Sequence, residues 1–338
     1  MADQRRGGIS WTDDTWNPIR GCSRVSPGCG GPQGQGGCYA ERFAIRLSGS
    51  GQSYEGLVRS TSNGPRWTGE VRFVEDALNL PLRWKKPRRI FVNSMSDLFH
   101  EKVPDEWIDR IFAVMALAPQ HTFQVLTKRP ERMRAYLEQV SDERDMQRWA
   151  RWADIAKSPC AAGIFDELDW PIANAHLGVS VEDQPTADAR IPLLLQTPAV
   201  VRFVSYEPML AAVDFSRWLS PCSYYCDHEQ QYPAGHHPER GLDGLICGGE
   251  SGPHARPCDL AWIRSVVAQC RAAGVRAFVK QLGARPFFAN LSEEMRACVR
   301  RIDFRSVPPS GGYLILRDRA GADPSEWPGD LRVREWPR

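Results

Sequence analysis

The chain reads GCSRVSPGC at residues 21–29 and CYAER at residues 38–42, which places Cys22, Cys29 and Cys38 near its start. Residues 16–20, just before this stretch, are short and partly apolar, as a strand would be, and the residues after Cys38 read as the first turn of a helix. A strand, a cysteine loop and a helix in that order present a reactive cluster at one end of a parallel barrel.

The number of these cysteines bears on the metal they would bind. Structural zinc is held by four closed ligands, whereas an iron–sulfur cluster held by three thiolates keeps one iron open for chemistry. A zinc site with a distant fourth ligand remains an alternative, because spacing alone does not settle the metal. A disulfide framework is the weaker alternative: the chain has 338 residues and no apolar secretory segment follows its first six residues. We therefore expect a cytoplasmic protein.

The composition is that of an ordinary soluble globular chain, with 42% hydrophobic and 25% charged residues and a formal net charge of +2. No stretch is apolar for the length of a membrane span, so no membrane association is expected. The charge balance excludes a general nucleic-acid coat but leaves room for a local basic patch. Such a patch surrounds Trp84 in residues 83–89, and the favoured alternative is a solvated approach to the next strand; its basic residues are Arg83, Lys85, Lys86, Arg88 and Arg89.

Short apolar runs alternate with longer amphipathic runs along the chain, which indicates repeated βα units and a parallel sheet. We expect an α/β fold, a full or partial (β/α) barrel over residues 10–285. After the cysteine loop, the expected strands are residues 90–94, 122–126, 176–181, 200–205, 245–248 and 277–281. The expected helices are residues 105–117, 130–140, 186–195 and 260–273.

Polar or ionisable side chains follow the expected strands one after another. In a parallel barrel these carboxyl ends share one face, where active sites are built. For any single residue a helix N-cap is an equally good interpretation, as for Ser96 or Asp183. The strand-end segments are residues 94–97, 127–129, 180–183, 205–208, 248–251 and 280–281.

Two inserts and a tail depart from the repeating pattern. The first insert, about residues 141–170, is charged and contains tryptophans, and we expect a helical excursion outside the barrel. The second, about residues 220–241, has ligand types that suit zinc, against the alternative of a mobile surface loop. Residues 286–338 are expected to be an extension packed on the barrel. The zinc candidates of the second insert are Cys222, Cys226, His228 and His236.

The cysteine stretch resembles the three-cysteine signature of a phage-associated family of radical-SAM-like proteins, distantly similar to spore photoproduct lyase. The resemblance covers most of residues 10–285 and implies a barrel of the radical-SAM type. The spacing here is C-x6-C-x8-C, wider than the general C-x3-C-x2-C, and the glycine-rich residues 30–37 can bulge outward without separating Cys29 from Cys38. The further matching blocks are NSMSDLF (93–99), LTKRP (126–130), GVSVE (178–182), SYEPML (205–210), GGESG (248–252) and KQLG (280–283).

The resemblance implies a [4Fe-4S] cluster on Cys22, Cys29 and Cys38, with S-adenosylmethionine bound at the open iron and an electron donor such as a flavodoxin or ferredoxin. It places Ser96 and Asp97 at the methionyl amino group. As hypotheses, Lys128 or Arg129 balances the methionyl carboxylate, Ser180 with Glu182 holds the ribose, and Tyr39 lies against the adenine. The candidates on the substrate side are Glu207, Glu250 and Lys280.

The substrate class follows from the resemblance, together with the basic, aromatic stretch at residues 83–89, which would hold a phosphate backbone beside the barrel. We expect isomerase- or lyase-type carbon-radical chemistry on a base in DNA or on a modified nucleotide, such as a hypermodified thymine of phage DNA in a bacterial host. A peptide or a small metabolite is an alternative substrate. A non-catalytic, zinc-stabilised nucleic-acid-binding protein is the alternative from another class, and it would be colourless.

Overall fold

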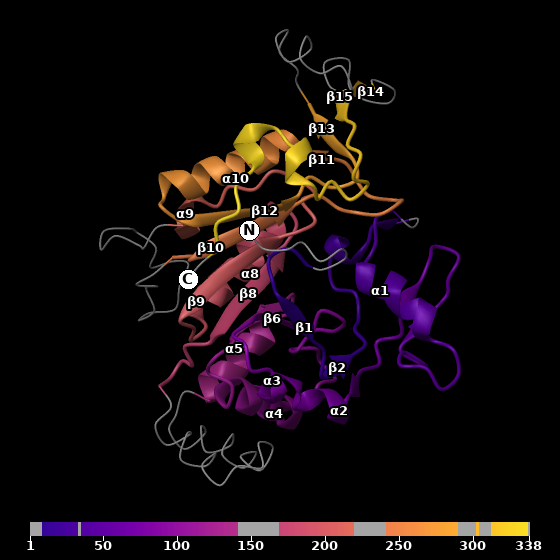
Figure 1. Cartoon of the computed structure of the whole chain (residues 1–338), viewed down its shortest axis with the longest axis vertical. Coiled ribbons are helices and arrows are strands. Elements are labelled where there is room, and N and C mark those ends of the chain that lie inside the picture. Colours follow the sequence, from indigo (N-terminus) through magenta and orange to yellow (C-terminus); the bar gives the residue numbers. More distant parts are fainter. Residues whose placement is uncertain are drawn as a thin grey trace. The chain divides into compact units, whose positions relative to one another are not determined.

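The computed structural model describes residues 9–32, 35–140, 169–219, 241–289, 302–303 and 312–336. Its main element is an α/β sheet in which neighbouring strands run parallel (Figure 1). The strand order starts at β1 and ends at β12, so the sheet is open and the expected barrel is partial. In sheet order the strands are β1 (Asp14–Trp16), β6 (Arg89–Val92), β7 (Thr122–Thr127), β8 (Ala175–Val181), β9 (Val201–Tyr206), β10 (Gly244–Gly248) and β12 (Arg276–Gln281).

The principal helices follow the expected pattern closely. They are α4 (Asp105–Ala116), α5 (Pro130–Gln139), α8 (Gln184–Gln196) and α10 (Leu260–Ala272). α5 begins with a proline, whose fixed φ and missing N–H suit a first helical position, and Asp259 caps α10 by accepting from the Ala261 N–H. These local signals explain why the expected helix boundaries lie within two residues of the observed ones.

The chain divides into two compact units, of which the first comprises residues 1–25, 39–179 and 190–203. Its strands β1, β6, β7 and β8 form parallel pairs, and Trp16 packs against Phe123 with ring centroids 5.7 Å apart. The smaller elements of this unit are β2 (Ile19–Arg20), α1 (Tyr39–Ala44), β3 (Val58–Arg59), β4 (Arg66–Trp67), β5 (Arg72–Phe73), α2 (Glu75–Leu78) and α3 (Leu80–Arg83).

The strand expected at residues 16–20 is divided. Trp16 ends β1 in the main sheet, whereas β2 pairs with β5 in a separate two-stranded sheet. Pro18 lies between them and has no N–H to donate to a sheet, which explains the interruption.

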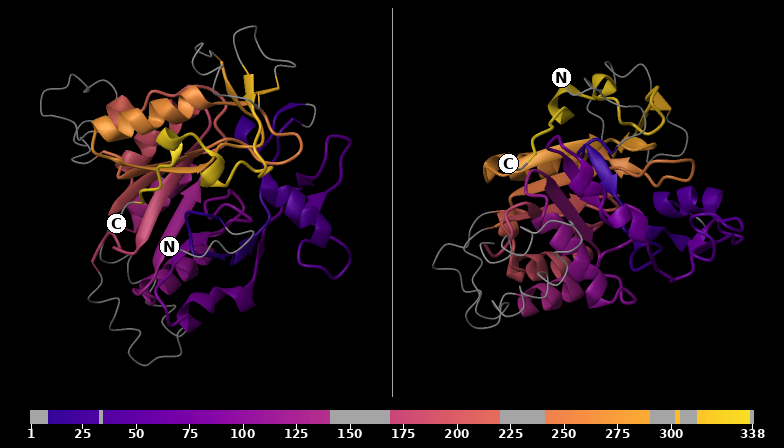
Figure 2. Two further views of the ribbon diagram at one scale, coloured as in Figure 1. Left: turned by 45° about the horizontal axis from the view of Figure 1, so that its top comes forward. Right: turned by 60° about the horizontal axis from the view of Figure 1, so that its bottom comes forward.

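The second unit comprises residues 26–38, 180–189 and 204–338. It contains α9 (Ser216–Leu219), and its helix α10 packs against β10 and β12 (Figure 2). The end of the C-terminal extension pairs with β12. The Val279 N–H of the strand donates to Val333 O at 2.8 Å, and the Glu335 N–H of the extension donates to Ala277 O at 2.9 Å. A four-stranded sheet contains β11 (Cys258–Asp259), β13 (Pro286–Phe288), β15 (Gly312–Leu314) and β14 (Ile302–Asp303).

Some expected features lie outside the described residues. They are nearly all of the insert at 141–170 and the zinc candidates Cys222, Cys226, His228 and His236. Among the described helices, none has the length and apolar character needed to cross a membrane.

Candidate functional site

In the first unit, the backbone before Cys22 is fixed to the end of β6. The Gly21 N–H donates to Met95 O at 3.3 Å, and Ser96 Oγ donates to Ile19 O at 3.0 Å. Gly21 has a φ of +92°, and a Cβ there would lie 2.2 Å from Glu70 O. Only glycine combines this backbone conformation with this approach, so Gly21 decides where Cys22 is placed.

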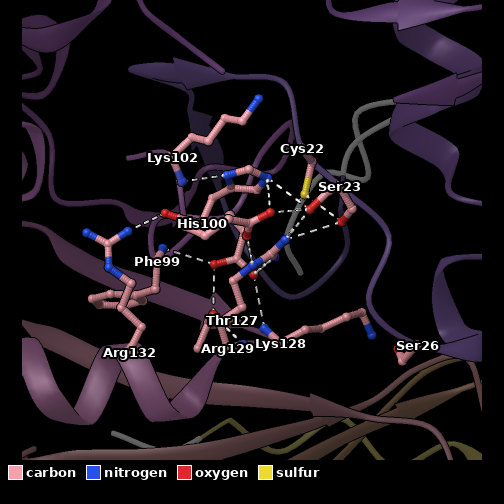
Figure 3. A network of polar contacts seen from close by, with 12 residues as sticks. Cys22, Ser23, Ser26, Phe99, His100, Lys102, Thr127, Lys128, Arg129 and Arg132 are labelled. Carbon is pink, nitrogen blue, oxygen red and sulfur yellow. Dashed lines mark hydrogen bonds and ion pairs between the residues drawn. The ribbon is translucent and has the colours of Figure 1, made fainter. Parts of the chain in front are cut away.

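Ser23, next to Cys22, is the centre of a polar network shown in Figure 3. Its Oγ donates to Glu101 Oε1 at 2.9 Å and accepts from Arg129 Nη2 at 2.7 Å. His100 Nε2 lies 3.0 Å from the same Oγ, and His100 Nδ1 accepts from the Lys102 N–H. The neutral ring therefore carries its proton on Nε2 and donates it to Ser23.

Asp97 and Arg129, both expected at the cofactor, form a buried ion pair in this network. Arg129 Nη1 lies 3.0 Å from Asp97 Oδ2, which also accepts from the Lys128 N–H at 3.1 Å. Asp97 Oδ1 accepts from Thr127 Oγ1 at 2.7 Å and from the Phe99 N–H at 3.0 Å. Two donors on each oxygen fill the carboxylate, so in this structure Asp97 orients Arg129.

The ionisation of this network follows from its charges. Burial lowers the pKa of Arg129, but the charges of Asp97, Cys22 and Glu101 raise it above the ordinary value. Burial raises the pKa of Glu101, yet hydrogen bonds from its own backbone and from Ser23, with the Arg129 charge, bring it to about 2. Burial and Arg129 lower the pKa of His100. At neutral pH, Arg129 is therefore a cation, Glu101 a carboxylate and His100 a neutral imidazole.

Tyr39 lies on the exposed surface of α1, with 49% of its area accessible, and its hydroxyl donates to Ser94 O. Lys128 is half-buried, and its backbone contributes to the Asp97 network. The structure thus brings Ser96, Asp97, Lys128 and Arg129 together at the ends of β6 and β7.

In the second unit, Glu182 supports the loop that leads to Cys29. Glu182 is fully buried at the end of β8, and its Oε1 accepts from Ser26 Oγ at 2.8 Å. A Cβ at Gly28 would lie 2.2 Å from the same Oε1. Ser180, two residues earlier, is directed elsewhere, since its Oγ donates to Glu207 O at 3.3 Å.

Glu250 contacts the other arm of this loop. Its Oε1 accepts from the Gly37 N–H at 2.9 Å, directly before Cys38, and its carboxylate binds Arg256 through both oxygens. Burial raises the pKa of Glu250, but the hydrogen bonds from Arg256 and Gly37 lower it below its ordinary value. The carboxylate is therefore an anion held by the loop and by Arg256.

Glu207 and Lys280, two candidates for the substrate side, lie together. Lys280 Nζ is 3.0 Å from Glu207 Oε1, and Ser205 Oγ donates to Glu207 Oε2 at 3.2 Å. About a quarter of the Lys280 side chain is accessible. Glycine at 248 leaves room for the pair, because a Cβ there would lie 3.1 Å from Glu207 Oε1.

The cysteines of the described part fall into two groups. Cys22 in the first unit and Cys29 and Cys38 in the second are half-buried, whereas Cys247, Cys258 and Cys270 are buried. Burial raises the pKa of each of the latter, to about 12 for Cys270, so they are inert core thiols. Within the described residues, no three or more Cys, His, Asp or Glu side chains are gathered as at a metal site.

Several residues of these networks were missed from the sequence, namely Ser23, Ser26, His100, Glu101, Lys102 and Arg256. Adjacent ionisable residues right after the strand-end block at 93–99 were a usable signal for His100 and Glu101. Arg256 gives no such signal, because its role depends on Pro27, 229 residues away along the chain.

The basic stretch at residues 83–89 is partly neutralised. Arg88 forms an ion pair with Asp14, and Arg89 with Asp13. The stretch leads into the amino end of β6, opposite to the end that carries residues 94–97. Lys85 and Lys86 are exposed. The patch therefore offers less positive charge than its sequence indicates.

Comparison with known proteins gives one family. The model of a family described as "Protein of unknown function (DUF5131)" matches residues 6–304, most of the chain, so the chain belongs to this family. Neither the curated proteins nor the solved structures gave a significant match.

Proposed function

We propose that this DUF5131 protein is a radical S-adenosylmethionine enzyme in which Cys22, Cys29 and Cys38 hold a [4Fe-4S] cluster. The observation that carries the proposal is that backbone near each of these half-buried cysteines is tied to charged side chains. The ties are from Arg129 to Ser23 O beside Cys22, from Arg256 to Pro27 O two residues before Cys29, and from the Gly37 N–H beside Cys38 to Glu250. Functional sites are held by such supporting contacts.

When bound, the cluster and S-adenosylmethionine would supply a 5′-deoxyadenosyl radical that abstracts hydrogen from an unactivated carbon. Glu207 and Lys280 are our candidates for moving a proton on the substrate. An ion pair at 3.0 Å can exchange a proton with a substrate group when one partner is accessible, as Lys280 is. The candidates for contact with the cofactor stay as expected from the sequence: Tyr39, Ser96, Asp97, Lys128, Arg129, Ser180 and Glu182.

The cluster is tested by anaerobic reconstitution of the full chain with iron and sulfide. We expect a brown protein that loses its iron in Cys22→Ala, Cys29→Ala and Cys38→Ala and keeps it in the control Cys270→Ala. Full iron and sulfide retention in Cys38→Ala would reject the ligand set. A colourless protein that takes up zinc on the same cysteines would instead support the zinc-stabilised nucleic-acid-binding alternative.

The proposed substrate is a base in DNA or a modified nucleotide. A small electron-transfer protein, such as a flavodoxin or ferredoxin, is the proposed electron donor. Reconstituted enzyme would be incubated with reductant, S-adenosylmethionine and DNA carrying candidate bases, and then digested to nucleosides for mass spectrometry. An altered nucleoside together with 5′-deoxyadenosine would support the proposal. 5′-Deoxyadenosine formed equally with and without every DNA, and no altered nucleoside, would favour a peptide or a small molecule.

A further inference from the structure

One ion pair of the second unit touches both arms of the loop between Cys29 and Cys38. Arg256 Nη1 donates to Pro27 O at 2.8 Å, on the arm that leads to Cys29. Glu250 Oε1 accepts from the Gly37 N–H at 2.9 Å, on the arm that leads to Cys38. The two arms are therefore joined through Glu250 and Arg256, and not only through the loop itself.

The pair has the geometry of a strong and specific contact. Arg256 Nε lies 2.8 Å from Glu250 Oε2 and Nη2 lies 3.0 Å from Oε1, so the guanidinium binds the carboxylate through two parallel hydrogen bonds. Such bidentate, charge-assisted pairs fix orientation as well as distance. The Glu250 side chain is 6% exposed and that of Arg256 is 15% exposed, so solvent weakens the pair little.

The loop is shaped to lie against this carboxylate. Gly36 has a φ of +62°, and a Cβ at this position would lie 2.4 Å from both carboxylate oxygens of Glu250. The Gly36 N–H donates to His254 O at 2.7 Å, between the two members of the pair in the chain. A side chain at residue 36 would push the loop away, so the glycine and the ion pair require each other.

We infer that Glu250 and Arg256 form a clasp that sets the spacing of Cys29 and Cys38 before any metal arrives. Four donors fill the Glu250 carboxylate: Gly37 N and, from Arg256, the backbone N, Nε and Nη2. Glu250 is therefore a positioning residue and not an acid or base for the substrate. The role at a metal rests on the proposed function, but the hold on the loop does not.

Two variants separate the clasp from ordinary stabilisation. Arg256→Ala removes the pair and the bond to Pro27. The charge swap Glu250→Arg with Arg256→Glu keeps an ion pair, but it leaves no acceptor for the Gly37 N–H and no donor for Pro27 O. Arg264→Ala is the matched control, because Arg264 pairs with Asp330 at 2.6 Å in the same unit, away from the loop.

The first measurement is amide hydrogen exchange of the full chain without iron. We expect peptides covering residues 26–38 to exchange on the order of tenfold faster in both variants, while β10 and β12 and the control Arg264→Ala keep the wild-type rates. A wild-type exchange rate of the loop in either variant would overturn the clasp. This includes the case in which the charge swap restores the protection of the loop amides that Arg256→Ala removes.

The second measurement is iron and sulfide content after anaerobic reconstitution. We expect both variants to retain several-fold less iron than the wild type and Arg264→Ala. If the loop exchanges faster in the two variants but no protein, the wild type included, binds iron, then the clasp stands and the proposed cluster is rejected. Iron bound equally by wild type and variants would reject the clasp's role at the metal.

Discussion

At the scale of single residues, Asp97 illustrates how a side chain chosen for a ligand contact can be engaged by the protein itself. Its two oxygens accept from four donors, and its partner Arg129 reaches on to Ser23 beside Cys22. The charge of Arg129 therefore lies near Cys22 because Asp97 keeps it there. A cation in that place favours a thiolate, the form of cysteine that binds metals.

Asp97→Asn is expected to destabilise the fold by about 1.5–3 kcal/mol, because Arg129 loses its charge-assisted hydrogen bond to Asp97 while it keeps its ion pair with Glu101. Equilibrium urea unfolding measures this. Glu138→Gln is the control, since it breaks the exposed Arg134–Glu138 pair on α5, which contributes at most about 0.5 kcal/mol. Equal destabilisation by the two substitutions would contradict this account of Asp97.

Glu101 gives the network a defined pH dependence. Its pKa falls from an ordinary 4.5 to about 2 in the folded protein, so its stabilising contribution is complete above pH 4.5 and is lost as the pH falls toward 2. The difference in urea midpoint between wild type and Glu101→Gln should be constant near neutral pH and shrink below pH 4.5. A difference that persists unchanged to pH 2 would show that the carboxylate charge plays no part.

At the scale of elements, the turn between β2 and Cys22 depends on backbone conformation. Gly21 and Gly69 both have positive φ, +92° and +86°, but only Gly21 has a neighbour within reach of a Cβ. The two positions therefore separate backbone strain from steric overlap. The overlap at Gly21 is with the backbone oxygen of Glu70, which cannot swing aside as a side chain can.

Gly69→Ala should destabilise by about 1 kcal/mol, the cost of a left-handed conformation for a residue with a Cβ. Gly21→Ala should add overpacking of about 1–3 kcal/mol to a similar strain. Thermal unfolding of the two variants beside the wild type gives the comparison. If both lower the melting temperature equally, the approach to Glu70 is not limiting.

Much of the fold could be predicted from local pattern, because buried parallel strands are continuous apolar runs. β10 (GLICG), for example, is buried at all five positions and begins one residue before the expected strand. Two-residue strands such as β2 and β3 are too short to show any alternation. The site was predicted only as a set of strand ends. The loop residues that Glu182 and Glu250 bind, Ser26 and Gly37, lie 156 and 213 residues away, and no local pattern encodes such pairings.

At the scale of the whole molecule, the open sheet must protect its edges, since an exposed strand edge invites pairing with other chains. At β12 the tail does this. Two backbone hydrogen bonds join residues 333 and 335 to the strand, and Trp336 packs edge-on against Phe278 at 6.3 Å. The family match ends at residue 304, so this cover lies beyond it.

A chain shortened to end at Leu331 should be less stable by about 2–4 kcal/mol, from two backbone hydrogen bonds and the aromatic contacts of the tail. It should also aggregate on heating, because the β12 edge becomes available. Thermal unfolding with light scattering detects both effects. A chain ending at Trp336 retains these contacts and serves as the control, and identical behaviour of the two chains would show that the tail is dispensable.

The division of the six thiols in the described residues into a half-buried group and a core group has a practical consequence for handling the protein. Air oxidises accessible thiols first, so damage at Cys22, Cys29 or Cys38 would leave the core cysteines and the fold untouched. A preparation could then give a native circular dichroism spectrum and a sharp melting curve while being unable to bind iron. Site-resolved alkylation of Cys22, Cys29 and Cys38, rather than any measure of folding, is the quality criterion that fits this molecule.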